Sequence, residues 1–292
     1  MAAENSFKIH YFFKLIRINN LLILTFVQLL FWFVFNTEHT HFISLILLIQ
    51  TTVFLAAGGN IINDFFDIES DKINKPQQII INKYISIKTA LSIYYVLTFF
   101  GILSGLILSY LQNKIWYGLL FILISLTLFL YSKTFKKIAL LGNTIVSLLT
   151  AISIYLVFIF LIDKTNQQLQ FIFLSYAFFA FFLNFIREIV KDIQDINGDY
   201  KLKMQTLPIL IGKNRTKNMV FYITFIPFIL VILLISGLKN TFLMVYSFLF
   251  IIFPLGYFMY EIKEVKRKKK LAQLSLLLKI IMLFGILSVV FL

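Results

Sequence analysis

Two groups of acidic residues stand at matching intervals in a chain that otherwise holds few charges. They are Asn63-Asp64-x-x-Asp67-x-x-x-Asp71 and Asp192-x-x-Asp195-x-x-x-Asp199. Together with Glu69 and Glu188, they contain more than half of the 13 acidic residues. Carboxylate and amide oxygens are the ligands that Mg²⁺ prefers, and Mg²⁺ is often shared between one or two carboxylates and substrate phosphates. The two groups therefore predict a magnesium site that also takes a phosphorylated substrate.

Helical geometry would gather each group on one face. Residues at i, i+4 and i+8 of an α-helix share a side, which aligns Asn63, Asp67 and Asp71. Stacked like charges repel, and a divalent cation would relieve that repulsion. If the two groups face each other, metal ions on either side of a diphosphate would neutralise it as it leaves, which is the chemistry of ionising an allylic diphosphate.

Basic residues close to these groups could hold the same phosphates. The candidates are Arg17, Lys75, Lys133, Lys136, Lys137, Lys191 and Lys203. The reaction would also need a dry cavity for a hydrocarbon tail, and 35 Phe and 14 Tyr residues supply aromatic side chains that can steady a carbocation.

The composition places these groups in a membrane protein. Of 292 residues, 60% are hydrophobic and 14% are charged, which is far from the composition of a soluble domain. The chain has no Cys and three His residues, so a thiolate nucleophile, a Cys-based metal site and a Ser-His-Asp triad are excluded. The net charge is +14, and in a membrane protein the placement of the basic residues indicates the topology. No nucleic-acid partner is expected.

Apolar runs predict an all-α, polytopic membrane protein with nine transmembrane helices around a central cavity. The runs lie near 18–36, 43–63, 89–111, 115–132, 138–162, 168–187, 218–237, 241–260 and 271–292. The second and sixth are expected to continue as helix into the acidic groups. We predict a single domain over 1–292, and we expect its short polar start, Met1 to Ser6, to be a disordered tail.

The distribution of Lys and Arg predicts the orientation. Most fall before the first run and in every second connection, whereas Lys114, Lys164 and Lys239 fall in the others. By the positive-inside rule the N-terminus and both acidic groups are cytoplasmic, and the C-terminus faces outward. We therefore expect an integral protein of the cytoplasmic membrane, in contact with membrane lipids, with its active site on the cytoplasmic side.

The motifs resemble those of the UbiA superfamily of intramembrane prenyltransferases. The matching segments are GGNIINDFFDIESDKINKP at 58–76, YSKTFKKIALLGN at 131–143 and REIVKDIQDINGD at 187–199. Within the superfamily, NDFFDIESDKINKP at 63–76, REIVKDIQDINGD at 187–199 and TLPILIG at 206–212 are most similar to the digeranylgeranylglyceryl phosphate synthase branch. The resemblance implies a UbiA-like fold and Mg²⁺-dependent transfer of a geranylgeranyl group from its diphosphate to the hydroxyl of a prenylated glycerol phosphate.

The resemblance also implies roles for individual residues. The expected ligands of metal and diphosphate are Asn63, Asp67, Asp71, Asp192, Asp195 and Asp199. These Asp residues and an assisting Asp64 are the candidate catalytic residues. Arg17 and Lys136 would contact phosphate, and Lys133 and Lys191 are further candidates for diphosphate binding. The chain departs from the family at NKPQQIIINK, 74–83, where Gln78 replaces a usual Arg and cannot supply its forked, charged contact.

Two other functions fit parts of the pattern. Within the same family, the acceptor could be an aromatic ring, as for a quinone or pigment precursor. From a different class, an ion-coupled transporter also keeps carboxylates in its membrane spans. A transporter predicts acidic residues near mid-span and discontinuous helices, whereas here the acidic residues follow the ends of two runs, beside long connections.

Overall fold

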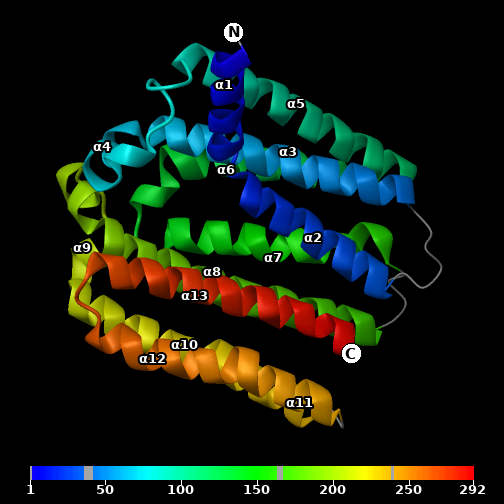
Figure 1. Ribbon diagram of the computed structural model, residues 1–292. Helices are drawn as coiled ribbons and strands as arrows, with labels where there is room; N and C mark the ends of the chain where they lie inside the picture. Colours follow the sequence, from blue (N-terminus) through cyan, green and yellow to red (C-terminus); the bar gives the residue numbers. More distant parts are fainter. Residues whose placement is uncertain (1, 36–41, 163–166, 238–239) are drawn as a thin grey trace. The chain divides into compact units, whose positions relative to one another are not determined.

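A computed structural model describes residues 2–35, 42–162, 167–237 and 240–292 (Figure 1). Within these ranges the chain folds into helices and forms no β-strand, which confirms the all-α prediction. The α-helices are α1 (Ala2–Leu15), α2 (Ile18–Phe35), α3 (Phe42–Phe66), α4 (Ile68–Asn74), α5 (Ile87–Leu111), α6 (Gly118–Lys133), α7 (Leu141–Leu161), α8 (Gln167–Lys201), α9 (Leu207–Ile211), α10 (Lys213–Ser236), α11 (Thr241–Ser247), α12 (Phe253–Glu264) and α13 (Lys268–Leu287).

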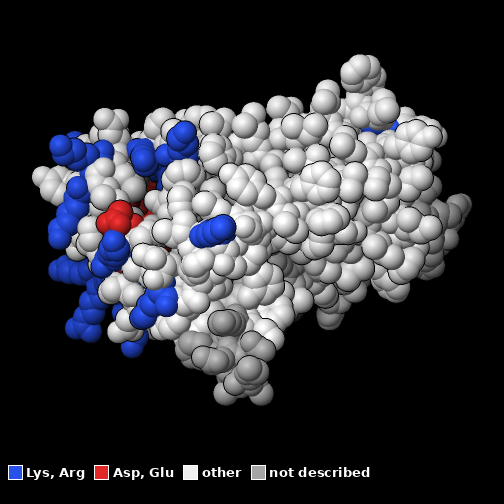
Figure 2. All heavy atoms as spheres, turned by 90° about the horizontal axis from the view of Figure 1, so that it is seen from above, with Lys and Arg blue, Asp and Glu red and all other residues white. Residues whose placement is uncertain are grey.

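Nine helical segments in the described ranges are long and apolar enough to cross a membrane. They are Ile18–Phe35, Phe42–Phe66, Ile87–Leu111, Ile115–Lys133, Leu141–Leu161, Gln167–Lys201, Lys213–Ser236, Thr241–Glu264 and Lys268–Phe291. The nine predicted spans are thus confirmed in number and order. A spanning helix satisfies its own backbone hydrogen bonds in lipid, and the face in Figure 2 has wide areas without charged side chains. The chain is an integral membrane protein.

The first of two compact units consists of residues 1–136 and 156–163. In this unit α3 packs along α5 and α6. The approach of α3 to α5 is close at Gly58, where an added Cβ would lie 2.9 Å from the Thr98 hydroxyl oxygen. Because successive spans run in opposite directions, the start of α2 and the ends of α3 and α6 lie at the same end of the unit. That end carries the first acidic group.

The N-terminal segment differs from the sequence prediction. We expected a disordered tail over Met1 to Ser6, whereas α1 already begins at Ala2. Its last residue, Leu15, is fully buried in the core of the first unit, together with Ile16. Burial of these apolar side chains anchors the end of α1, a contribution that the polar composition of the first residues did not reveal.

The second unit consists of residues 137–155 and 164–292, and contains the second acidic group. Its longest helix, α8, packs against α10 and runs antiparallel to α13 (Figure 1). The Tyr176 and Ser288 hydroxyls lie 2.7 Å apart near one end of the α8–α13 pair. Lys268 lies 3.9 Å from Asp195 near the other end. These contacts fix the register of the two helices. The prediction of one domain over 1–292 stays a prediction, and Lys164 and Lys239 lie outside the described residues.

Candidate functional site

The first acidic group lies where α3 gives way to α4. Asn63 and Asp64 belong to the last turn of α3, Asp67 forms the junction, and Asp71 belongs to α4. The backbone N–H of Asp67 donates to the Asn63 carbonyl at 2.9 Å, and that of Asp71 donates to the Asp67 carbonyl at 2.8 Å. Helical hydrogen bonding therefore continues through the junction, so Asn63, Asp67 and Asp71 follow one another at intervals of about one helical turn.

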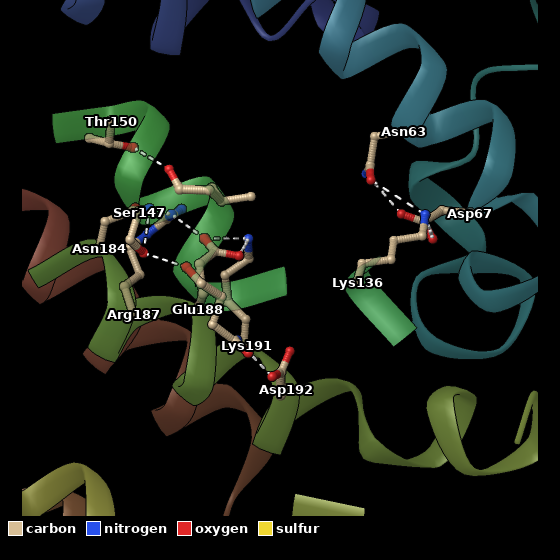
Figure 3. Close-up of polar contacts among 12 residues, drawn as sticks. Asn63, Asp67, Lys136, Ser147, Thr150, Asn184, Arg187, Glu188, Lys191 and Asp192 are labelled. Atoms are coloured by element: carbon tan, nitrogen blue, oxygen red, sulfur yellow. Dashed lines mark hydrogen bonds and ion pairs between the residues drawn. The ribbon is translucent and has the colours of Figure 1, made fainter. Parts of the chain in front are cut away.

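Asp67 is held by a lysine and an amide. The Lys136 ammonium donates to Asp67 Oδ1 at 2.6 Å, and the Asn63 side chain donates to Asp67 Oδ2 at 2.8 Å (Figure 3). The Lys136 side chain is only 9% exposed. A desolvated ion pair of this kind is strongly destabilised when one partner is removed, so each charge depends on the other.

Arg17 supplies a second cation to this group. Its guanidinium donates to Asp64 Oδ1 at 2.6 Å. Desolvation disfavours the charged guanidinium, but the Asp64 carboxylate outweighs it and raises the pKa of Arg17 above its ordinary value. The Arg17 backbone has φ 56°, a left-handed conformation that is costly for a residue with a Cβ. This conformation between α1 and α2 is part of how the chain directs Arg17 towards Asp64.

A small polar cavity lies beside the same carboxylates. It has a volume of about 10 Å³ and is lined by Asp64, Asp71, Gln78 and the apolar residues Ile68 and Ile79–Ile81. The residue that departs from the family pattern, Gln78, therefore lies within the first acidic group's own surroundings. A change of charge at Gln78 would act directly on these carboxylates.

The second acidic group lies on one continuous helix, as predicted. Asp192 accepts a hydrogen bond of 2.8 Å from the Asn143 side chain on α7, and Asp195 is near Lys268 of α13. Asp199 is buried and accepts a hydrogen bond of 3.5 Å from the Thr206 hydroxyl. Partners from α7, α13 and the segment before α9 thus orient the three carboxylates on α8.

One turn before Asp192, Glu188 forms the centre of an ion-pair cluster. Glu188 is buried and accepts hydrogen bonds of 2.9 Å from Arg187 and from Lys191. Figure 3 shows these three side chains grouped near Asn184 and Ser147. The predicted diphosphate ligand Lys191 is therefore engaged with Glu188 in this structure.

The donor chemistry of both groups fits Mg²⁺ bound together with a phosphorylated ligand. Among the described residues, no three His, Cys, Asp or Glu side chains are gathered as a preformed metal cage. The carboxylates are instead partnered with cations and amides, which offset part of the repulsion that the sequence predicts. Since Mg²⁺ is commonly held by one or two carboxylates, with phosphate oxygens completing its shell, the oxygen-only groups suit it.

The lysines predicted to bind diphosphate differ in whether they lie near the carboxylates. Lys136 joins Asp67, whereas Lys133 lies over the Phe129 ring at 5.9 Å and is not brought to the carboxylates. Sequence reasoning missed the pairing of Asn143 with Asp192 and the cluster around Glu188. The available signal was a polar or charged residue inside an otherwise apolar run, which is costly in a membrane and is usually kept for a purpose.

Comparisons with known proteins agree with this architecture. Residues 21–283 match the model of the UbiA prenyltransferase family. The chain is 37% identical over 209 residues to the digeranylgeranylglyceryl phosphate synthase of Methanococcus aeolicus, covering 71% of this chain and 70% of that protein. It also resembles a solved structure of a digeranylgeranylglyceryl phosphate synthase, with a TM-score of 0.71, 25% identity and coverage of 97% and 98% of the two chains.

A second solved structure shares the fold at lower identity. It is a UbiA homologue from Archaeoglobus fulgidus bound to DMAPP and Mg²⁺, with a TM-score of 0.66 and 17% identity. The match covers 96% of this chain and 99% of that one. The helical arrangement is therefore shared well beyond the range of recognisable sequence identity.

Proposed function

Because this chain belongs to the UbiA prenyltransferase family, we propose that it transfers a geranylgeranyl group from its diphosphate to the hydroxyl of a prenylated glycerol phosphate. The reaction breaks the bond between the prenyl carbon and diphosphate, and forms an ether to the glycerol oxygen with release of its proton. The observation that carries this proposal is the pair of acidic groups of equal spacing, each with its own cations and amides. They stand in a chain that is similar to a digeranylgeranylglyceryl phosphate synthase.

The residues of each acidic group are proposed to bind Mg²⁺ and diphosphate. Mg²⁺, held by Asn63, Asp67, Asp71, Asp192, Asp195 and Asp199, would supply positive charge that stabilises the leaving group. Arg17 and Lys136 are placed on Asp64 and Asp67, and would donate hydrogen bonds to phosphate oxygens when substrate arrives. Lys191, and less directly Lys133, remain further candidates for diphosphate binding.

The proposal includes a membrane and an orientation. The basic residues before α2 and at the starts of α5, α10 and α13 support a cytoplasmic position for the acidic groups, and an outward C-terminus. Prenyl diphosphates are charged and water-soluble at one end, so a site at the cytoplasmic side would receive them directly while the acceptor stays in the membrane.

Product identity tests the proposed reaction. Purified protein in detergent would be incubated with labelled geranylgeranyl diphosphate and Mg²⁺, with either geranylgeranylglyceryl phosphate or a hydroxybenzoate as acceptor. We expect an ether-linked product from the first acceptor, and its loss on addition of EDTA. A prenylated ring would instead establish the aromatic reaction, and metal-dependent ion uptake without prenyl transfer would favour a transporter.

Replacement of Gln78 by Arg is expected to tighten the binding of the prenyl diphosphate. The new guanidinium would lie at an exposed position beside Asp64 and Asp71, from which it can donate to a phosphate oxygen. One charge-assisted hydrogen bond at an exposed position is worth about 1 kcal/mol, or about a fivefold fall in the KM for diphosphate. Steady-state kinetics at saturating acceptor measure it.

The neighbouring Gln77→Arg variant is the matched control for Gln78. Gln77 is exposed and does not line the cavity. The Gln77→Arg variant therefore adds the same charge to the same segment without placing it in the cavity lining. An equal fall of KM in both variants would show a general electrostatic effect and contradict the proposed contact.

Arg17 can be tested with two neutral variants. Both Arg17→Gly and Arg17→Gln remove the guanidinium, so each is expected to raise the KM for diphosphate by about tenfold or more. Only glycine relieves the left-handed backbone, and the Gly variant should be more stable than the Gln variant by about 1 kcal/mol. Kinetics and thermal unfolding in detergent measure the two effects separately, and normal kinetics in both variants would contradict the phosphate contact.

A further inference from the structure

One corner of the second unit concentrates basic side chains. It is built from residues 213–217, at the start of α10, and residues 261–270, from the end of α12 into α13. These two segments hold nine of the chain's 27 Lys and Arg residues, against two Glu residues. The exposed cations that we call the basic corner are Lys213, Arg215, Lys266, Arg267 and Lys269.

Contacts between α10 and α12 hold the two segments together. The Lys217 ammonium donates to the backbone carbonyls of Lys263 at 2.9 Å and of Val265 at 3.3 Å. The Lys263 ammonium lies 3.7 Å from the centre of the Phe221 ring, as a cation–π pair. Val265 is buried in the core of the second unit. The turn between α12 and α13 is therefore anchored on both sides, and it presents the basic corner from a preorganised base.

The cations of the basic corner stand where helices disfavour them. α10 begins at Lys213 and α13 begins at Lys268, and neither helix has an acidic residue in its first turn. Arg215 and Lys269 belong to these first turns. The N-terminal end of a helix carries partial positive charge, so cations there lower the stability of the helix. An anion bound against this corner would offset that cost.

Exposed tyrosines lie close to the basic corner along the same helices. They are Tyr222 on α10, and Tyr257 and Tyr260 on α12. At 1.5 Å per residue, Tyr260 lies about 6 Å along the axis from the last residue of α12, and Tyr222 about 14 Å from the first residue of α10. Tyrosine is enriched at the boundary between lipid and water, where its ring stays in an apolar layer and its hydroxyl meets the head groups. Exposed cations and tyrosines at this end of the spans thus match the depth of lipid head groups.

We propose that the basic corner binds the head group of an anionic phospholipid. Lys266, Arg267 and Lys269 would donate hydrogen bonds to its phosphodiester, while its chains lie along the exposed apolar side chains of the spans. Charge complementarity suits any acidic partner, but the tyrosines favour a lipid over a soluble acidic protein. This lipid takes no part in prenyl transfer, so the site is additional to the proposed reaction and does not depend on it.

Lipid titration tests this site. Purified protein in detergent would be titrated with phosphatidylglycerol or with phosphatidylcholine of the same chain length, and bound lipid measured by native mass spectrometry. We expect wild-type protein to prefer phosphatidylglycerol by about tenfold or more, and the Lys266→Gln/Lys269→Gln variant to lose this preference. The control is Lys83→Gln/Lys88→Gln, which removes two exposed lysines from the first unit and should keep it. An unchanged preference in the Lys266→Gln/Lys269→Gln variant would overturn the proposal.

Thermal unfolding separates loss of the site from loss of the fold. Removing a cation from the first turn of α13 lowers an unfavourable charge interaction, so the lipid-free Lys266→Gln/Lys269→Gln variant should melt at the wild-type temperature or higher. Added phosphatidylglycerol should raise the melting temperature of wild type and have a smaller effect on this variant. An equal rise with phosphatidylcholine would show that lipid charge is not recognised, and would contradict the inference.

Competition distinguishes a lipid site from the substrate site. Geranylgeranyl diphosphate with Mg²⁺ should leave the binding of phosphatidylglycerol unchanged, and displacement would assign these cations to the diphosphate and overturn the inference. Displacement by an equal concentration of inorganic phosphate would assign the site to free phosphate instead. A preference for phosphatidylglycerol that depends on Lys266 and Lys269, in a protein that makes no ether product, would support the lipid site and refute the proposed reaction.

Discussion

Asp67→Asn is expected to lower turnover by roughly 100- to 1000-fold, the effect of removing one group that stabilises charge in a transition state. Asn keeps the size of the side chain and can still accept a hydrogen bond from Lys136, but it removes the negative charge that would hold Mg²⁺. Because Lys136 is almost fully buried against Asp67, the variant should also lose roughly 1–3 kcal/mol of unfolding free energy. Initial rates at saturating Mg²⁺ and both substrates measure the catalytic loss.

Glu69→Gln is the control for Asp67. Glu69 lies two residues away, is exposed, and pairs with Lys72 on the surface of α4. The same loss of one carboxylate charge at this position should leave turnover within about twofold of wild type, since exposed ion pairs contribute little. Comparable losses in both variants, or full activity in Asp67→Asn, would remove Asp67 from the site.

Asp192→Asn should produce a similarly large loss from the other unit. Asp192 accepts a hydrogen bond from Asn143 at 2.8 Å, which fixes the carboxylate for a metal or a phosphate-bound metal. The amide in its place would have no charge, and could point an N–H at the Asn143 side chain. We expect roughly a 100-fold or greater fall in kcat, with a higher requirement for Mg²⁺. Titration of activity with Mg²⁺ measures both effects.

The Asn143 variants separate orientation from charge. Asn143→Ala leaves the charge of Asp192 intact but removes its hydrogen bond, so a loss of about 10-fold is expected, smaller than that of Asp192→Asn. If Asn143→Ala were as inactive as Asp192→Asn, orientation by Asn143 would be as important as the charge itself. Wild-type activity in a folded Asp192→Asn protein would contradict the role proposed for the second acidic group.

The sequence predicted the elements of this fold well because lipid leaves the chain little choice. Each apolar run of about 20 residues must form a helix to satisfy its backbone hydrogen bonds, so nine runs correspond to nine spans. The same reasoning extended the sixth helix into the second acidic group, and α8 does continue to Lys201. Spacing also singled out the acidic residues of each group, and their role in binding stays a prediction.

Tertiary partners could not be predicted in the same way. Lys133 and Lys136 are three positions apart and are the same residue type, yet only Lys136 reaches Asp67, because the chain turns after the end of α6. Nothing in the local sequence pairs Asn143 with Asp192, which is 49 positions away. The left-handed backbone conformation of Arg17 could not be predicted either, because Arg rarely adopts it. Such features depend on packing between distant segments.

The two acidic groups differ in the helices that carry them. The second is carried by α8, a helix of 35 residues and about 50 Å that is continuous with its membrane span. Its carboxylates can change position relative to α13 and α10 only if α8 itself moves against these two helices. The first spans a joint at Asp67, beyond which α4 is a short segment of seven residues. Any movement of the first group relative to its own membrane span should therefore occur by bending at Asp67, whereas the carboxylates of the second group keep their spacing along α8.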